Sequence, residues 1–304
     1  MTQTEIIEEI KEKEFKPELK AQEYLSPSSI NTFYKCPRQY FYRYIAKLPE
    51  RLTIDLVKGS IVHSTLEHFF KEYNKNLKEE LFSLFEKQWI KAEKDITLLE
   101  LKEDEITTAK EDMKNILTEY FENFNRKLQA LIKVGKAENE QHAFFLIKPK
   151  FRELKVESEK YKCRGYIDRV SEDYNGILTL ADYKTSVKYG VGLPMDYKRQ
   201  LSIYALLYQE KERLPDFVAV NFLRYGEEYL LEVGPSVIKF AINTIQDAYS
   251  KTRSANLEDY PLNEGSLCRW CPFLSFCSGQ KKFEDELRLI QLEKKIGEKN
   301  ETGR

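Results

Sequence analysis

The spacing of apolar and polar positions changes from helical to strand-like and back along the chain. Large apolar residues at helical spacing follow Ser26, which has the character of an N-cap and precedes a proline suited to the first helical position. A further helix is expected to open at Gly59. Residues 77–134 are charged, contain neither glycine nor proline, and predict an inserted helical subdomain.

Strand-like alternation is expected from Ala143 to Tyr183, with turns at glycines. The Asn175-Gly176 pair is a strong signal for a hairpin turn. Helix is then predicted over 197–212, a pair of strands over 216–225 and 228–233, and helix again over 236–254. The sequence therefore predicts a sheet core over residues 143–233, bordered by helical segments.

The ends of the chain have a different composition from its middle. Residues 1–23 are mostly charged and predict a leader helix or tail, and residues 281–304 predict a charged C-terminal helix or tail. The segment between them, residues 24–280, is expected to form the main domain. Its last part, residues 261–280, contains a cluster of cysteines.

Composition limits the class of protein. With 304 residues, of which 41% are hydrophobic, the chain can bury a sizeable core. Its apolar runs are of strand length and its first residues lack a signal-peptide pattern, so we expect a cytoplasmic protein with no membrane partner. No phosphate-binding loop or dinucleotide fingerprint is present in the sequence. A net charge of -1 excludes a global attraction to nucleic acid, so a DNA groove would need a local basic patch.

Two aspartates and a lysine stand on the successive strands that the hairpin signal joins. Side chains alternate along a strand, so Asp182 and Lys184 share a face while Tyr183 points to the other. The turn would bring Asp168 close to Asp182. Carboxylates of this kind suit Mg²⁺ or Mn²⁺, which can activate water against a phosphodiester. The alternative is that Asp168 pairs with Arg169 at a turn and that Asp182 and Lys184 are ordinary exposed strand residues.

The five cysteines favour a metal site over disulfides, because a cytosolic chain gains little from disulfides. Cys268, Cys271 and Cys277 form a triplet, and Cys36 lies far upstream. Their spacing is unusual for zinc, which commonly takes two close pairs, and fits an iron–sulfur cluster better. Zinc and buried unligated cysteines remain the alternatives. Cys163 is expected in the core.

Six segments in order resemble one family. They are Leu25-Ser-Pro-Ser-Ser-Ile-Asn-Thr-Phe-Tyr-Lys-Cys36-Pro-Arg-Gln-Tyr40, Gly59-Ser-Ile-Val-His63, Gly165-Tyr-Ile-Asp168, Asp182-Tyr-Lys184, Gln200-Leu-Ser-Ile-Tyr204 and the terminal cysteine triplet. Together they resemble the RecB-like branch of the PD-(D/E)xK nuclease superfamily, and among its members the iron–sulfur type, similar to the AddB nuclease domain and the CRISPR-associated RecB-like exonucleases. The resemblance spans about residues 25 to 277.

The resemblance implies an α/β (α+β) fold with a mixed β-sheet flanked by helices. It implies metal ligation by His63, Asp168, Asp182 and the main-chain carbonyl of Tyr183, with Lys184 as the catalytic lysine. Gln200 and Tyr204 match a helix that lies beside the active site and contacts DNA or orients the lysine. The four-iron four-sulfur cluster would be held by Cys36, Cys268, Cys271 and Cys277, joining the two ends of the domain as a structural clasp. Glu153 and Glu67 are weaker candidates and stay outside this set.

These observations predict a metal-dependent deoxyribonuclease, an exonuclease acting on single-stranded DNA or DNA ends. A helicase, a repair protein or a CRISPR-adaptation protein is an expected partner of such a family member. Tyrosines at 24, 34, 40, 42 and 44 could stack unpaired bases, or pack in the core. The basic candidates for a DNA groove are Lys35, Arg38, Arg43, Lys47, Arg51, Arg164, Arg169, Lys188, Lys198 and Arg199. The rival functions are a catalytically silent DNA-end-binding protein, a zinc-stabilised adaptor, and a nuclease of RNA or an endonuclease.

Overall fold

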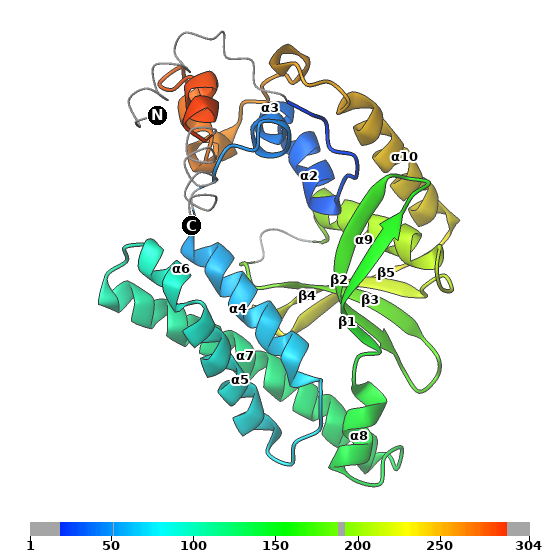
Figure 1. Ribbon diagram of the computed structural model, residues 1–304. Coiled ribbons are helices and arrows are strands. Elements are labelled where there is room, and N and C mark those ends of the chain that lie inside the picture. Colours follow the sequence, from blue (N-terminus) through cyan, green and yellow to red (C-terminus); the bar gives the residue numbers. More distant parts are fainter. Residues whose placement is uncertain (1–18, 51, 188–191, 291–304) are drawn as a thin grey trace, which may run out of the picture. The chain divides into compact units, whose positions relative to one another are not determined.

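The computed structural model describes residues 19–50, 52–187 and 192–290 (Figure 1). The chain divides into two compact units. One comprises residues 52–246, and the other combines residues 1–51 with 247–304. The expected leader over 1–23 and tail over 281–304 lie mostly outside the described residues, although positions 283–290 are helical.

The larger unit contains a helical segment followed by a five-stranded sheet. Its helices are α4 (Ile54–Phe69), α5 (Leu77–Lys91), α6 (Glu93–Leu98), α7 (Glu103–Lys133), α8 (Glu140–Ile147) and α9 (Met195–Gln209), with α10 (Pro235–Lys251) running out of it. Its strands are β1 (Phe151–Ser158), β2 (Cys163–Glu172), β3 (Leu178–Lys184), β4 (Phe217–Phe222) and β5 (Glu227–Glu232), with the short η2 (Leu223–Tyr225) before β5.

The sheet is mixed. Its strands follow the order β1-β2-β3-β4-β5. Only β3 and β4 are parallel among these pairs, and α9 makes the crossover between them, since a parallel connection needs a long excursion. The predicted hairpin at Asn175-Gly176 is confirmed: it joins β2 to β3, and Gly176 adopts a φ of 79°. The strand pair predicted after residue 216 is β4 and β5.

The alternation of side chains along β3 determines which helices lie on each side of the sheet. The Tyr183 ring packs edge-on against Tyr120 of α7, with 6.0 Å between centroids. Its neighbour Asp182 accepts a hydrogen bond from Gln200 of α9. Helix α7 therefore covers the Tyr183 side, which we call the back of the sheet, and α9 covers the Asp182 side, giving a three-layer unit (Figure 1).

The helices of residues 54–147 form one apolar layer with the back of the sheet. Leu66 of α4, Leu81 of α5 and Leu117 of α7 are all fully or almost fully buried in this cluster, which also includes Tyr183. A polar contact reinforces it: Asp112 of α7 binds Lys58 of α4 and Arg224 of η2. Residues 77–134 are thus mostly helical, as predicted, and they pack on the back of the sheet.

Two local predictions are wrong. The apolar run Ala143–Ile147 is the end of helix α8 rather than a strand, because Asn139 caps the helix by accepting a hydrogen bond from His142 N, and the first strand begins at Phe151. Gly59 lies inside α4 and does not open it, because Thr53 caps that helix. A side chain at Gly59 would face Thr185, directly after β3.

The smaller unit joins the two ends of the chain around aromatic side chains. It contains α2 (Pro27–Lys35), α3 (Pro37–Tyr40), η1 (Phe41–Ile45), the end of α10, η3 (Leu257–Asp259), η4 (Ser266–Trp270) and α11 (Leu274–Cys277). Ser26 is the N-cap of α2, as predicted, in a capping box with Ser29. Tyr40 stacks on Tyr260, and Arg38 donates a hydrogen bond to the Tyr260 carbonyl at 2.7 Å. Within the described residues, no helix is long and apolar enough to span a membrane.

Candidate metal centre

The candidate site forms where β2 and β3 separate. Their ladder pairs Arg169 with Ala181 and extends from there toward the turn. At the next position away from the turn, the side chain of Asp168 takes the place of a backbone hydrogen bond between the strands. Its Oδ2 accepts a hydrogen bond from Tyr183 N at 2.6 Å. The Asp168 side chain is 10% exposed, so the carboxylate is held at the opening between the strands.

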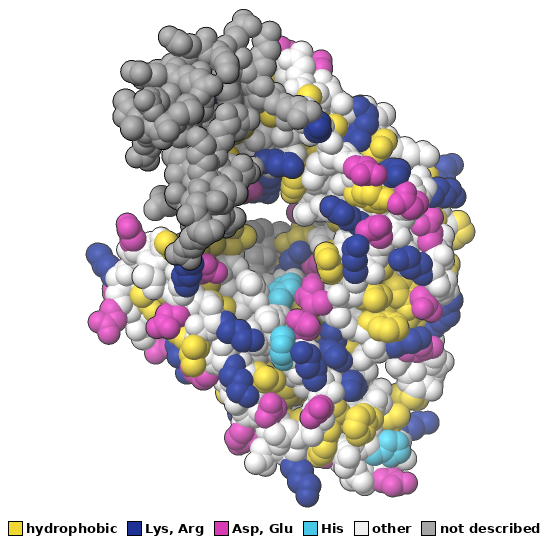
Figure 2. Space-filling model, viewed as in Figure 1, with side chains coloured by type: hydrophobic (Ala, Val, Ile, Leu, Met, Phe, Trp, Pro, Cys, Tyr) yellow, Lys and Arg dark blue, Asp and Glu magenta, His cyan; other side chains and the backbone are white. Residues whose placement is uncertain are grey.

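Three side chains converge there as a potential cation site. His63 of α4, Glu153 of β1 and Asp168 of β2 each offer a ligand atom, and the three atoms lie within 4.8 Å of one another. His63 Nδ1 is 3.4 Å from Asp168 Oδ1 and 3.9 Å from Glu153 Oε1. About 30% of the Glu153 and His63 side chains is exposed, and histidine and acidic surfaces lie side by side on the face in Figure 2. A cation could reach these atoms from solvent.

Glu153 was left outside the predicted set, yet the structure brings it into the group. The register of β1 and β2 pairs Arg152 with Arg169 and Leu154 with Ile167, which puts Glu153 opposite Asp168. Its backbone has a φ of 47°, an uncommon value for a residue with a side chain. Strained backbone of this kind concentrates at functional sites. In the sequence, Glu153 could be recognised only as an acidic residue before Asp168. Its place opposite Asp168 depends on the register between the two strands, which the sequence alone did not define.

A second group, made of four predicted residues, stands beside the first. Asp182 Oδ1 accepts from Gln200 Nε2 at 2.7 Å, and Asp182 Oδ2 lies 2.7 Å from Lys184 Nζ. Gln200 also donates to the Tyr204 hydroxyl at 3.0 Å and accepts from Lys184 at 3.4 Å. These contacts fix the lysine between a carboxylate and an amide. The predicted sharing of one face by Asp182 and Lys184 is confirmed.

Burial and mutual repulsion shift the proton affinities of the acids. Burial, and then the charge of Asp168, raises the pKa of Glu153 to about 7. Burial also raises the pKa of Asp182, although Lys184 opposes that shift. For His63 burial acts downward, but the hydrogen bond and charge of Asp168 outweigh it and raise the pKa. Carboxylates crowded in this way are stabilised by a positive charge placed among them.

The donor set fits a hard divalent cation. Carboxylate oxygens with one imidazole suit Mg²⁺ or Mn²⁺. Asp182 Oδ2 is buried and makes no well-angled hydrogen bond, having only the ion pair with Lys184. The three-residue group consists of His63, Glu153 and Asp168, whereas both oxygens of Asp182 face Lys184 and Gln200. Ligation by Asp182 and by the carbonyl of Tyr183 stays a prediction.

The four predicted cluster cysteines meet at one place in the smaller unit. Cys36, Cys268, Cys271 and Cys277 all line a cavity of about 540 Å³. Burial raises the pKa of the Cys271 thiol, and the sulfurs of Cys36 and Cys268 raise it further. Cys163 is fully buried in β2, away from this cavity, as expected of a core residue.

Other predicted residues have different surroundings. Arg169 does not pair with Asp168 and cannot line a DNA groove on the Asp168 side, because it turns to the back of the sheet and pairs with Glu228. Tyr40 and Tyr42 are buried in the aromatic core of the smaller unit, so they do not offer stacking faces. Arg51 and Lys188 lie outside the described residues.

Residues 24–278 match the PD-(D/E)XK nuclease superfamily. One similar solved structure, from Eubacterium rectale, carries the description "Putative exonuclease". It shares 14% sequence identity, the similarity covers 82% of this chain and 87% of that chain, and the TM-score is 0.44. No curated protein matches the chain.

Proposed function

Because the chain belongs to the PD-(D/E)XK nuclease superfamily, we propose that it is a metal-dependent deoxyribonuclease that hydrolyses phosphodiester bonds. Superfamily membership implies a nucleic acid substrate. The observation that carries the proposal is the meeting of two groups at one strand opening: the acidic and histidine side chains around Asp168, and the Asp182, Lys184 and Gln200 contacts beside them. A binding protein without catalysis has no need of a lysine held in this way.

In this proposal His63, Glu153, Asp168 and Asp182 hold Mg²⁺ or Mn²⁺, with the Tyr183 carbonyl as a further ligand. The bound ion would supply Lewis-acid polarisation of a phosphoryl oxygen. The protein contributes orientation: Asp168 is held by the Tyr183 amide, and His63 is held by Asp168. The unusual backbone of Glu153 directs a further carboxylate to the same point.

Lys184 supplies a proton donor at the reacting phosphate. Burial acts to lower its pKa, but the Asp182 carboxylate outweighs burial and raises it, so the ammonium is charged at neutral pH. A charged ammonium can donate a hydrogen bond to the attacking water, or to a non-bridging phosphate oxygen on which negative charge develops. Gln200 sets the position of Lys184, and Tyr204 holds Gln200 by accepting its hydrogen bond.

We also propose that the four cysteines hold a four-iron four-sulfur cluster with a structural role. In support, all four line one cavity. The spacing of the triplet, which is unusual for a zinc site, also favours a cluster.

The finer parts of the proposal follow the resemblance. They are membership of the RecB-like iron–sulfur branch, exonuclease action on single-stranded DNA or DNA ends, and work in repair or CRISPR adaptation beside a helicase or another partner. Residues 35–38 and 260–263, which the clasp would join, are already linked by hydrogen bonds from Arg38 to Tyr260 and from Asn263 to Lys35. The cluster would reinforce an existing contact between the two ends of the chain.

The activity is tested with end-labelled single- and double-stranded DNA incubated with Mn²⁺, Mg²⁺ or EDTA. We expect cleavage only with added metal, and short labelled products that reveal cutting from an end. Asp182→Asn should abolish cleavage while its circular dichroism spectrum stays that of the wild type. DNA binding without cleavage by the wild type under every metal condition would favour the catalytically silent alternative.

Two glutamates on the same strand provide a matched comparison. Glu153→Gln removes an oxygen charge from the cation group, whereas Glu157→Gln changes a residue of β1 that pairs with Lys155. Mn²⁺ titration calorimetry should show weaker binding by about tenfold or more for Glu153→Gln and unchanged binding for Glu157→Gln. Equal affinity in both variants would exclude Glu153 as a ligand.

The cluster is tested by anaerobic purification and an absorption spectrum. We expect a brown protein with a broad visible band, which Cys271→Ser weakens strongly. Cys163→Ser is the control, because that residue is buried away from the cavity and its substitution should leave iron content unchanged. A colourless protein containing one zinc per chain would refute the cluster and leave the nuclease proposal standing.

A further inference from the structure

A second cavity lies behind the catalytic strands, on the α7 side of the sheet. Its volume is about 470 Å³, which is within the range of small-molecule sites. Arg169 and Glu228 line it from β2 and β5, and Lys127 lines it from α7. We call it the back cavity. Arg169 follows Asp168 in the chain and points the opposite way, with its guanidinium 5.9 Å from the Tyr183 ring.

Inside the back cavity, Lys127 and Arg169 share a single acidic partner, Glu228. Arg169 forms an ion pair with Glu228, and Lys127 Nζ lies 4.0 Å from the other oxygen of Glu228. Two cations thus share one carboxylate. The Arg169 side chain is only 13% exposed, and its Nε is buried without a hydrogen-bond partner. An anionic group in the cavity would give the two cations that share Glu228 a second negatively charged partner.

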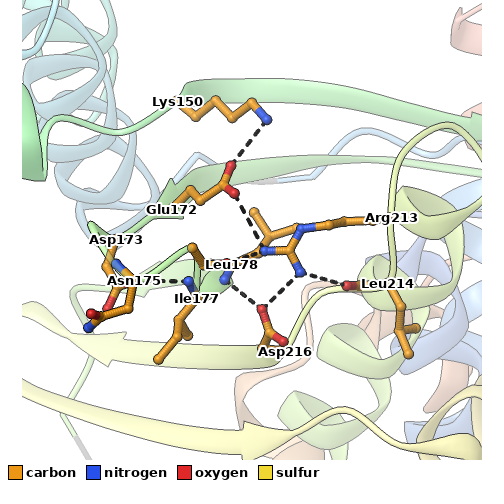
Figure 3. A network of polar contacts seen from close by, with 10 residues as sticks. Lys150, Glu172, Asp173, Asn175, Ile177, Leu178, Arg213, Leu214 and Asp216 are labelled. Atoms are coloured by element: carbon orange, nitrogen blue, oxygen red, sulfur yellow. Dashed lines mark hydrogen bonds and ion pairs between the residues drawn. The ribbon is translucent and has the colours of Figure 1, made fainter.

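The two acids at the rim make their own contacts and do not pair with Lys127 or Arg169. Glu172 pairs with Lys150 at 3.3 Å and with Arg213 at 3.6 Å (Figure 3). Asp173 turns into the hairpin, where it accepts hydrogen bonds from Asn175 N and Ile177 N, each at 2.9 Å. The network in Figure 3 also holds this rim in place, since it ties the hairpin turn to the segment before β4.

The mouth of the cavity is apolar although it faces solvent. Tyr174, Ile177 and Leu230 line it, and they are 53%, 40% and 57% exposed. Inside, Phe70 and Phe124 form an aromatic wall. Large apolar side chains gathered around the opening of a cavity are typical of a binding site. A ligand that covers them would have an apolar body as well as a charge.

We propose that the back cavity binds a small organic monoanion with an aromatic or aliphatic body, such as a carboxylate or sulfonate. Its anionic group lies beside Lys127 and Arg169, and its body packs on Phe124 and the apolar mouth. A nucleic acid strand at Asp168 cannot fill this cavity, because the sheet separates the two. The inference is independent of the nuclease proposal, since it rests on the opposite face of β2 and β3.

The probe for this proposal is 8-anilinonaphthalene-1-sulfonate, an aromatic monoanion whose fluorescence rises on binding. Its uncharged analogue N-phenyl-1-naphthylamine tests the role of the charge. We expect saturable binding of the sulfonate to the folded chain. Lys127→Glu should weaken that binding by about tenfold or more and leave binding of the uncharged analogue unchanged, because only the anion needs the lysine.

A pair of exposed leucines locates the site. Leu230→Glu, at the mouth, should weaken both probes, whereas Leu98→Glu, on α6 and 67% exposed, should weaken neither. Thermal melts check that each variant is folded, and Lys127→Met, which removes the charge without reversing it, is the second variant for the charge. The proposal is overturned if binding does not saturate, if Lys127→Glu and Lys127→Met both bind the sulfonate as the wild type does, or if Leu98→Glu acts like Leu230→Glu.

Discussion

Asp112 of α7 binds side chains of α4 and η2, and its replacement tests how much these contacts stabilise the fold. Its carboxylate binds Arg224 of η2 and Lys58 of α4, the helix that also carries His63. Arg224, and then Lys58 acting against burial, lowers the pKa of Asp112 to about 2. We expect Asp112→Asn to reduce the free energy of unfolding at pH 7.

The magnitude follows from the shift. A lowering from 3.8 to about 2 corresponds to about 2.4 kcal/mol at 1.36 kcal/mol per pKa unit. Because the carboxylate is partly solvated, screening reduces this to about 1 to 2 kcal/mol. The folded-state pKa is below the unfolded one, so the stabilisation is complete above about pH 5 and is lost as the pH falls toward 2. Near pH 3 about half of it should remain.

Urea unfolding followed by circular dichroism measures the effect at pH 7 and again near pH 3. Glu111→Gln is the matched control, since Glu111 is the exposed neighbour of Asp112 on α7 and its change should stay within about 0.5 kcal/mol. The reasoning is refuted if wild type and Asp112→Asn have the same free energy of unfolding at pH 7, or if the difference between them grows as the pH falls.

Three further substitutions have defined outcomes. Lys184→Met should slow cleavage of end-labelled DNA by about 10²- to 10⁴-fold while Glu157→Gln cuts at the wild-type rate; equal rates would contradict the role of the lysine. Leu117→Ala, at a fully buried position of α7, should lower the free energy of urea unfolding by about 2 to 5 kcal/mol; a loss below about 1 kcal/mol would mean that the layer is loosely packed. Gly226→Ala should cost about 1 to 3 kcal/mol in thermal unfolding, because φ is 59° there and a Cβ would meet an α7 side chain; Gly234→Ala, with open space around it, should be neutral.

Much of the site was predictable because it depends on short-range rules. Strand alternation and a hairpin signal between two aspartates placed Asp168, Asp182 and Lys184 together. The same alternation rule, applied to the neighbour of Asp168, would have turned Arg169 to the back of the sheet and excluded it from a DNA groove. The error arose because Arg169 was chosen for its charge alone, without asking to which face of the sheet its side chain points.

The remaining errors concern signals that compete or act over distance. The run 143–147 has strand length, but the cap at Asn139 makes it the end of a helix, and length alone cannot separate the two. Gly59 was taken as a helix start, although Thr53 was the better N-cap. Glu153 depends on strand register and on a positive φ, neither of which the sequence defines.

The smaller unit has a consequence for how the protein is made. Arg38 and the Tyr260 carbonyl that it binds are 222 residues apart in the chain. At 5 to 20 residues per second, a ribosome needs roughly 10 to 40 s to synthesise that interval. During this time Tyr40 has emerged but Tyr260, on which it stacks, has not been made. The segment around Tyr40 therefore exposes aromatic side chains until Tyr260 has been synthesised, and the unit closes only after that point.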